Sequence, residues 1–204
     1  MTKPSRITPE ARSLVRDAAV AMARRGLATG SSGNVSIRLG DRLLITASGV
    51  PYEQIEVDQI IEIDLDGTPY SGRGAPSSEW RMHAAVYRVR DDVEAIVHTH
   101  SLHATAAAIA LTELPIPHDE GRIFYGSSVP VSVHHPPGSW ELAYAVATAL
   151  GGGRLALIAR HGAIAVGHSL DQALLDAVKL EEIARLSLLE RQYRTLIPEY
   201  EVPP

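Results

Sequence analysis

The spacing of apolar residues predicts that the chain begins with an amphipathic helix. Apolar side chains recur at intervals of three and four positions, the period of a helix with one buried face, at Leu14, Val15, Ala18, Ala19 and Met22. Thr8 is a suitable N-cap, Pro9 suits the first helical position, and Gly26 is a suitable stop. A helix is therefore expected between Thr8 and Gly26.

The pattern then changes to alternation, which predicts strands. Apolar and polar residues alternate over 35–39 and apolar residues return over 43–46, with the turn Gly40-Asp41 between them, which is typical of a β-hairpin. Further strands are expected at 60–65, 95–99, 129–133, 155–159 and 163–166. Further helices are expected at 78–89, 102–111, 139–150 and 170–196. This order predicts an α/β or α+β layered domain with a largely antiparallel sheet.

Length and composition narrow the class of protein. A chain of 204 residues with 45% hydrophobic content is expected to form one domain over residues 1–204. The net charge of −5, with basic residues scattered among acids, argues against a nucleic-acid surface. Absence of Cys excludes disulfides and thiolate chemistry. The sequence shows neither a signal-like segment nor a membrane span, so we expect a cytoplasmic protein that does not interact with membranes.

A pair of histidines follows the apolar run over 95–97. His98 and His100 are two positions apart, so a strand directs both imidazoles to one face, as half of a metal site requires. Glu79 and His161 each lie beside a predicted turn and complete a set suited to zinc or, alternatively, Mn²⁺ or Co²⁺. The alternatives are a half-exposed strand with two ordinary histidines, and a Glu79 that only complements the dipole of the helix it begins.

Three small polar turns are candidates for binding an anion. Hydroxyl and backbone N–H groups in such turns can hold a phosphate, although Gly/Ser turns also simply reverse the chain. The candidate residues are Ser31, Asn34, Ser48, Gly49, Ser77 and Ser78. Together with a metal set, they indicate a small phosphorylated substrate.

Five motifs together resemble the class II aldolase/adducin family, and most closely its bacterial fuculose-1-phosphate aldolase branch. They occur in the family's order and cover the chain from about residue 9 to residue 190. The motifs are GNVS at 33–36, ITASGVPYE at 45–53, PSSEWRMH at 76–83, VHTH at 97–100 and RHG at 160–162.

The resemblance implies a zinc-dependent lyase with a three-layer α/β/α fold around a central, mostly antiparallel sheet. It also implies a homotetramer with active sites near the subunit interfaces. By motif, His98, His100 and His161 match the metal-binding histidines, and Glu79 matches the carboxylate that approaches the metal and moves the substrate proton. The six residues of the polar turns match the phosphate site. His83, four residues after Glu79, is structural in the family pattern.

The implied reaction is cleavage of a ketose 1-phosphate to dihydroxyacetone phosphate and an aldehyde, through a metal-stabilised enediolate. The substrate would be of the fuculose, ribulose, deoxypentulose or methylthioribulose 1-phosphate type. A second acid/base is also needed, and the position of the family's tyrosine aligns with Asp119, with Tyr125 as a nearby substitute. Tyr200 is a loose match to a second tyrosine, in the family's C-terminal tail.

Other functions of the same family remain open at this point. The stretch 98–105 and the tripeptide at 124–126 resemble sugar-phosphate 4-epimerases. Methylthioribulose-1-phosphate dehydratases and phospho-sugar-acid decarboxylases also begin from a metal-stabilised enediolate or enolate. A non-enzymatic scaffold like the adducins is a further alternative, against which the retained metal set argues.

Overall fold

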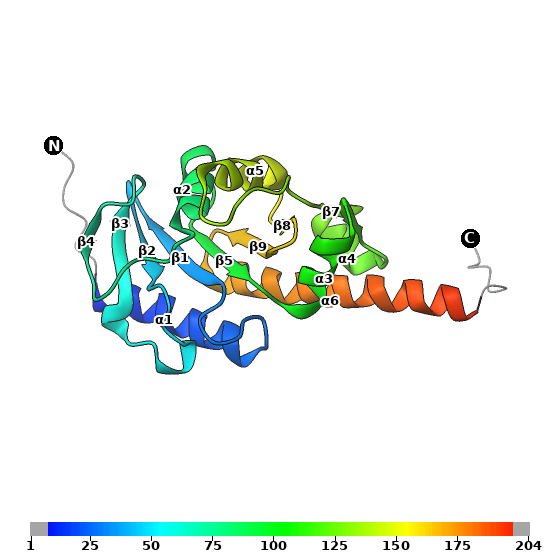
Figure 1. Cartoon of the computed structure of the whole chain (residues 1–204), viewed down its shortest axis with the longest axis horizontal. Helices are drawn as coiled ribbons and strands as arrows, with labels where there is room; N and C mark the ends of the chain where they lie inside the picture. The colour runs from blue at the N-terminus through cyan, green and yellow to red at the C-terminus, as the bar shows by residue number, and fades with distance from the viewer. Residues whose placement is uncertain (1–7, 198–204) are drawn as a thin grey trace.

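The protein is a layered arrangement of helices around a sheet, described here from a computed structural model of residues 8–197 (Figure 1). The strands are β1 (Asn34–Leu39), β2 (Arg42–Thr46), β3 (Ile60–Asp64), β4 (Pro69–Ser71), β5 (Ala95–Thr99), β6 (Glu113–Pro115), β7 (Ser128–Pro130), β8 (Leu155–Ile158) and β9 (Gly162–Gly167). The helices are α1 (Pro9–Arg24), α2 (Trp80–Val89), α3 (Leu102–Ala110), α4 (Asp119–Tyr125), α5 (Trp140–Leu150) and α6 (Leu170–Leu196), with short 3-10 turns at Tyr52–Gln54 and Val57–Gln59.

Seven strands form the central sheet, in the order β4-β3-β2-β1-β5-β9-β8. Each pair of neighbours in this sheet is antiparallel. Strands β6 and β7 form a separate antiparallel pair. The expectation of a mostly antiparallel sheet is confirmed.

Helices cover both faces of the sheet, and each face has its own hydrophobic core. Residues of α1, α3 and α6 pack on one face, whereas residues of α2 and α5 pack on the other; Figure 1 shows these two groups below and above the sheet. The alternation along β2 explains the division, because Leu44 belongs to the first core and its neighbours Leu43 and Ile45 belong to the second. The predicted three-layer α/β/α fold is confirmed.

Most predicted elements are present, with one helix and two short strands that the sequence patterns missed. Helix α1 begins as expected, with the Thr8 hydroxyl accepting from the Ala11 N–H group at 3.3 Å. The segment that contains Asp119 was predicted as a loop but forms α4. Strands β4 and β6 were not predicted, and the strand expected at 129–133 is the shorter β7, paired with β6. Within residues 8–197, no helix is long and apolar enough to cross a membrane.

The antiparallel order brings four chain segments to one end of the sheet. Strand β1 begins at Asn34, and its neighbours β2 and β5 end beside it at Thr46 and Thr99. Strand β9, on the far side of β5, begins at Gly162 at the same end. The predicted polar turns and the histidine pair are therefore brought together at this end.

Candidate metal centre

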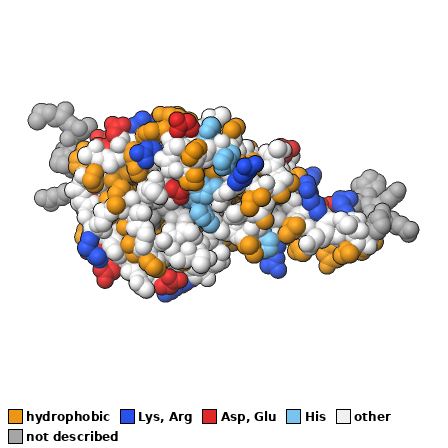
Figure 2. Space-filling model, viewed as in Figure 1, with side chains coloured by type: hydrophobic (Ala, Val, Ile, Leu, Met, Phe, Trp, Pro, Cys, Tyr) orange, Lys and Arg blue, Asp and Glu red, His pale blue; other side chains and the backbone are white. Residues whose placement is uncertain are grey.

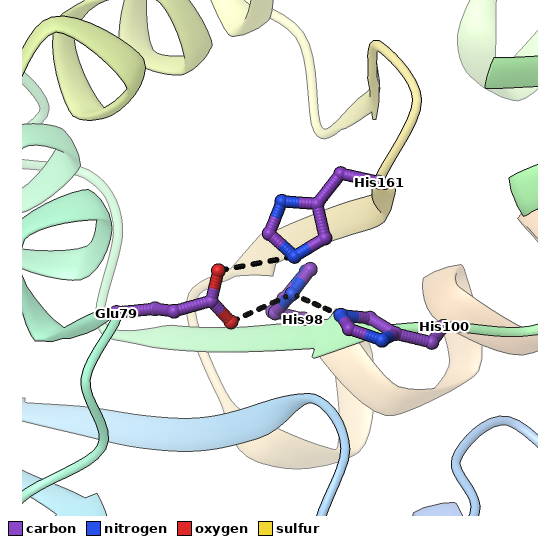
Figure 3. A group of neighbouring side chains, drawn as sticks. All are labelled: Glu79, His98, His100 and His161. Carbon is purple, nitrogen blue, oxygen red and sulfur yellow. Dashed lines mark hydrogen bonds and ion pairs between the residues drawn. The ribbon is translucent and has the colours of Figure 1, made fainter. Parts of the chain in front are cut away.

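Four side chains from three parts of the fold point toward one another at this end of the sheet (Figure 3). His98 lies on β5 and His100 follows the end of that strand, so the period of two directs both rings the same way. His161 comes from the turn between β8 and β9. Glu79 is the residue before α2, and within the described residues its side chain makes no capping hydrogen bond, so helix capping does not explain its position.

The atoms that could bind a metal are close together. Glu79 Oε2 lies 3.1 Å from His98 Nε2, and Glu79 Oε1 lies 3.1 Å from His161 Nε2. His100 Nε2 lies 3.0 Å from His98 Nε2. All four candidate ligand atoms lie within 4.8 Å of one another.

The surrounding backbone orients the rings. His98 Nδ1 lies 2.8 Å from the carbonyl oxygen of Ala163 on β9, so Nδ1 donates to that oxygen and Nε2 is directed at the cluster. Gly162 allows the turn to lie close to β5, because a Cβ at this position would be 2.3 Å from the carbonyl oxygen of Thr99. Any larger residue would push the segment that carries His161 away from the histidine pair.

The charges in the cluster depend on one another. Burial alone would raise the pKa of Glu79, but His98 and His161 outweigh burial through charge and hydrogen bonding, and hold that pKa well below its usual range. Burial alone would lower the pKa of His98, but the charge and hydrogen bond of Glu79 leave it raised. Burial, with the charges of His98 and His161, lowers the pKa of His100 to about 4. The Glu79 carboxylate is therefore ionised near pH 7, and the His100 ring is neutral and has a nitrogen that can bind a metal.

The donor set fits a divalent metal ion. Glu79 Oε1 is buried and, within the described part of the chain, has no hydrogen-bond partner of ordinary geometry, although a ring nitrogen lies 3.1 Å away. A buried carboxylate oxygen in this state is costly unless a cation or a proton satisfies it. Imidazole nitrogen and carboxylate oxygen are the ligands that zinc uses in proteins without thiolates. The cluster could therefore hold a metal ion.

A polar cleft opens beside the cluster. Its volume is about 470 Å³, and no Lys or Arg is among the described residues that line it. Figure 2 shows histidine side chains reaching the surface along the middle of this face. The lining includes all six residues predicted for the phosphate, together with Glu79, His100 and His161; the six are Ser31, Asn34, Ser48, Gly49, Ser77 and Ser78. An anion here would be held by hydroxyl and N–H groups.

The two candidates for the second acid/base do not line this cleft. Asp119 is exposed at the first residue of α4. The Tyr125 hydroxyl donates to Asp176 Oδ1 at 2.7 Å and lines a separate cavity between α4 and α6. Tyr200 lies outside the described residues. The catalytic roles of Asp119 and Tyr125 therefore stay predictions.

Sequence reasoning missed a chain of buried polar residues behind Glu79. Asn34, His83, Ser36 and Tyr87 follow one another in hydrogen-bond contact. The sequence did contain a signal for this chain of residues. Asn34 and Ser36 are two positions apart on one strand, and His83 and Tyr87 are four apart on one helix, so each pair lies on one face of its element. The sequence alone could not show that these two faces pack against each other.

Comparison with known proteins places the chain in a family. The family model for the class II aldolase and adducin N-terminal domain matches residues 13–188. L-fuculose phosphate aldolase of Escherichia coli K12 is 40% identical over 172 residues, which are 84% of this chain and 80% of the relative. The 5-methylthioribulose-1-phosphate/5-deoxyribulose-1-phosphate aldolase of Rhodospirillum rubrum is 36% identical over 189 residues, which are 92% and 83% of the two chains.

A solved structure supports the same assignment. An L-fuculose 1-phosphate aldolase superimposes with a TM-score of 0.87 and 30% sequence identity, over 92% of this chain and 89% of that one. The sequence match and the superposition of the fold agree. The chain belongs to the class II aldolase and adducin family.

Proposed function

We propose that this protein is a divalent-metal-dependent aldolase that cleaves a ketose 1-phosphate to dihydroxyacetone phosphate and an aldehyde. The observation that carries the proposal is that Glu79, His100 and His161, grouped with the buried His98, line a cleft whose other lining residues are mostly small and polar. The metal set would face the reacting carbons, and the polar turns would hold the phosphate. The names of the relatives support this class of reaction.

The proposed metal is zinc, held by Glu79, His98, His100 and His161. When bound, such an ion acts as a Lewis acid that disperses the negative charge left on the three-carbon fragment. Neutral imidazole ligands keep the site electrophilic, which suits this role. Manganese and cobalt use similar ligands and are the alternatives.

Glu79 is the proposed acid/base at the carbon of the three-carbon fragment. Its carboxylate is ionised and half-buried at the metal cluster, so it can accept the proton that dihydroxyacetone phosphate loses in the synthetic direction. Cleavage is the reverse, with the protonated carboxyl group returning that proton. Asn34 donates to Glu79 Oε2 at 3.0 Å and keeps the carboxylate oriented toward the cluster.

The second acid/base, for the hydroxyl that becomes the aldehyde oxygen, is proposed to be Asp119 or Tyr125. Because Asp119 is exposed and Tyr125 already donates to Asp176, Asp119 is the better candidate. Neither lines the cleft of its own chain, so such a role requires a neighbouring copy. The homotetramer expected from the family resemblance is therefore part of this proposal.

The phosphate is proposed to lie among the hydroxyl and N–H groups of the three turns. Two backbone hydrogen bonds fix two of these turns. Ser77 N donates to the carbonyl of Thr46 at the end of β2, at 3.0 Å, and Ser48 N donates to the carbonyl of Ala75, at 2.9 Å. This arrangement leaves the serine hydroxyls available to a dianion without basic side chains.

The test is product analysis with a panel of ketose 1-phosphates of the fuculose, ribulose, deoxypentulose and methylthioribulose types. Zinc-loaded protein should release dihydroxyacetone phosphate from at least one of them, and protein treated with a chelator should release none until zinc is restored. A phosphate inverted at C4 would instead indicate an epimerase, a diketone phosphate a dehydratase, and carbon dioxide from a phospho-sugar acid a decarboxylase. Any of these three outcomes without aldehyde release would contradict the proposal.

A further inference from the structure

Four buried side chains lead from Glu79 into the protein interior, behind the cleft. Asn34 Nδ2 lies 3.0 Å from Glu79 Oε2, and Asn34 Oδ1 contacts His83 Nε2. His83 Nδ1 lies 2.6 Å from Ser36 Oγ, which lies 2.8 Å from the Tyr87 hydroxyl. All four side chains are at most 1% exposed. Water cannot replace any of these contacts without a change in packing.

The side chains of Asn34, His83, Ser36 and Tyr87 form a relay of hydrogen bonds, and rigid elements hold both sides of it. Asn34 and Ser36 lie on the same face of β1, where they are paired with β5. His83 and Tyr87 are one helical turn apart on α2. The relay thus connects the strand and helix that flank Glu79, and it extends away from the metal cluster.

The chemistry of the partners allows one direction for the protons. Asn34 Nδ2 donates to Glu79 Oε2, so the amide presents its N–H group to the carboxylate. The amide oxygen then faces His83 and can only accept, so the proton of the ring must be on Nε2. His83 Nδ1 in turn accepts from the Ser36 hydroxyl, and the Ser36 oxygen accepts from Tyr87. Every hydrogen in the relay therefore points toward Glu79, an arrangement in which each bond strengthens the next.

Burial supports the neutral ring that this order requires. Desolvation, followed by the charge of His98, lowers the pKa of His83 to about 3. A neutral imidazole has one donor and one acceptor, which is what its two partners need. An imidazolium would have two donors and would leave the Ser36 hydroxyl hydrogen with no acceptor on the ring.

We propose that His83 is a positioning residue that, supported by Ser36 and Tyr87, fixes the orientation of the Asn34 amide and through it the Glu79 carboxylate. With the proton on Nδ1, the amide would turn and place its oxygen against Glu79 Oε2. Two acceptors would then face each other, and the carboxylate would move from its position between His98 and His161. The consequence for catalysis rests on the proposed acid/base role of Glu79, whereas the direction of the relay does not.

The direct test is the tautomer of His83, read from the side-chain nitrogen resonances of protein labelled with ¹⁵N-histidine. The signal is assigned by its loss in His83→Gln. We expect an Nε2–H imidazole in both metal-free and zinc-loaded protein near neutral pH. A ring with its proton on Nδ1, or a charged ring, would overturn the proposal. This measurement needs no substrate and is made on the wild-type protein, with His83→Gln used only for the assignment.

The second test compares substitutions that keep or remove the donor at the Nε2 position. Glutamine can still present an N–H group to Asn34, whereas leucine cannot. We expect His83→Leu to lower kcat by about 10- to 100-fold, the usual loss when the partner of a site ligand is removed, with a much smaller change in KM. His83→Gln should recover most of that loss, and equal kcat values for the two variants would contradict the proposal.

Two serine variants separate positioning from loss of a buried hydroxyl. Ser36→Ala removes the donor to His83 Nδ1 and should lower kcat and broaden or shift the His83 nitrogen signals. Ser132→Ala is the matched control, because its hydroxyl is also buried but has no hydrogen-bond partner among the described residues and lies outside the cleft. Equal effects of the two on the His83 signals would contradict the relay. If the wild-type protein cleaves no ketose phosphate, the proposed reaction is refuted. The tautomer of His83 would still test the direction of the hydrogen bonds in the relay.

Discussion

Two carboxylates in this protein, the buried Asp176 and the half-buried Glu79, differ in how their oxygens are satisfied. Asp176, on α6, accepts from the Tyr125 hydroxyl and Gln172 Nε2 at Oδ1, and from Arg154 Nε at Oδ2, at 2.7 to 2.8 Å. Glu79 accepts from Asn34 at Oε2, whereas its Oε1 has no ordinary hydrogen-bond partner among the described residues.

The difference separates a structural acid from a reactive one. Asp176 is surrounded by donors that fix α4, β8 and α6 relative to one another, so its charge stabilises the fold. Glu79 faces ring nitrogens that can bind a metal, so part of its hydrogen-bonding capacity is unused. A carboxylate with one oxygen left without a hydrogen-bond partner beside three imidazoles is more informative about function than a fully satisfied one.

The largest effect is expected from removal of a metal ligand. His98→Ala should abolish stoichiometric zinc binding and reduce cleavage to background, because a nitrogen donor is lost from the centre of the cluster. Elemental analysis of the purified protein and an assay for dihydroxyacetone phosphate measure the two effects. Full zinc content in this variant would show that the cluster is not the metal site.

Glu79→Gln should act on turnover and not on folding. We expect kcat to fall by about 10²- to 10⁴-fold, the range for loss of a general acid/base, with a melting temperature close to that of the wild type. The side chain keeps its size but loses its charge and basicity. Turnover like that of the wild type would remove Glu79 from the proposed mechanism.

Asp176→Ala should show the opposite pattern. Loss of the acceptor leaves Arg154 and Tyr125 without their partner, so the free energy of unfolding should fall by about 3 kcal/mol, measured by urea denaturation. The kcat of the folded fraction should be close to the wild-type value. A large loss of kcat without a loss of stability would contradict the structural role given to Asp176 and its contrast with Glu79.

Asp119→Asn tests whether the region near Asp176 also contributes to catalysis, from a neighbouring copy. We expect kcat to fall by about 100-fold, the lower end of the acid/base range. Mixing this variant with Glu79→Gln, after reversible dissociation, should restore part of the activity. Some sites in the mixed oligomers would then combine the intact Glu79 of one chain with the intact Asp119 of its neighbour. If mixing restores nothing, the second acid/base lies elsewhere.

The last effect is on stability alone, in its dependence on pH. Burial lowers the pKa of His83 from its usual 6.5 to about 3 in the folded protein, so below pH 6.5 the unfolded chain binds more protons than the folded one. Stability should therefore fall as pH decreases from about 6.5 toward 3. His83→Gln has no such proton, so urea denaturation of the two metal-free proteins should show the wild type losing stability more steeply over this window. If the free energy of unfolding of the two proteins changed with pH by the same amount, the lowered pKa of His83 would be contradicted.

Local periodicity was sufficient to predict most of the fold. The helical spacing in α1 predicts that helix because α1 buries one stripe, and alternation predicts β1. The short apolar runs at β2 and β5 predict strands that are buried on both faces. Helix α4 was missed because it is short, contains Gly121 and has few buried residues. The three-residue strands β4 and β6 contain or adjoin prolines and have no measurable alternation.

The candidate site was predictable in part. The spacing of His98 and His100 specifies a shared face, and the motif resemblance pointed to Glu79 and His161. The relay through Asn34 and His83 depends on the packing of α2 against β1, which connects residues 49 positions apart. Such contacts come from the tertiary structure and have no local signature.

The central claim is that three imidazoles and one carboxylate of this chain hold a single divalent ion beside the substrate. Anomalous diffraction from crystals of the zinc-loaded protein, collected on both sides of the zinc absorption edge, tests it most directly. The account predicts one peak per chain within bonding distance of Nε2 of His98, His100 and His161. A crystal with zinc in excess and no peak there, or with its only peak elsewhere, would contradict it.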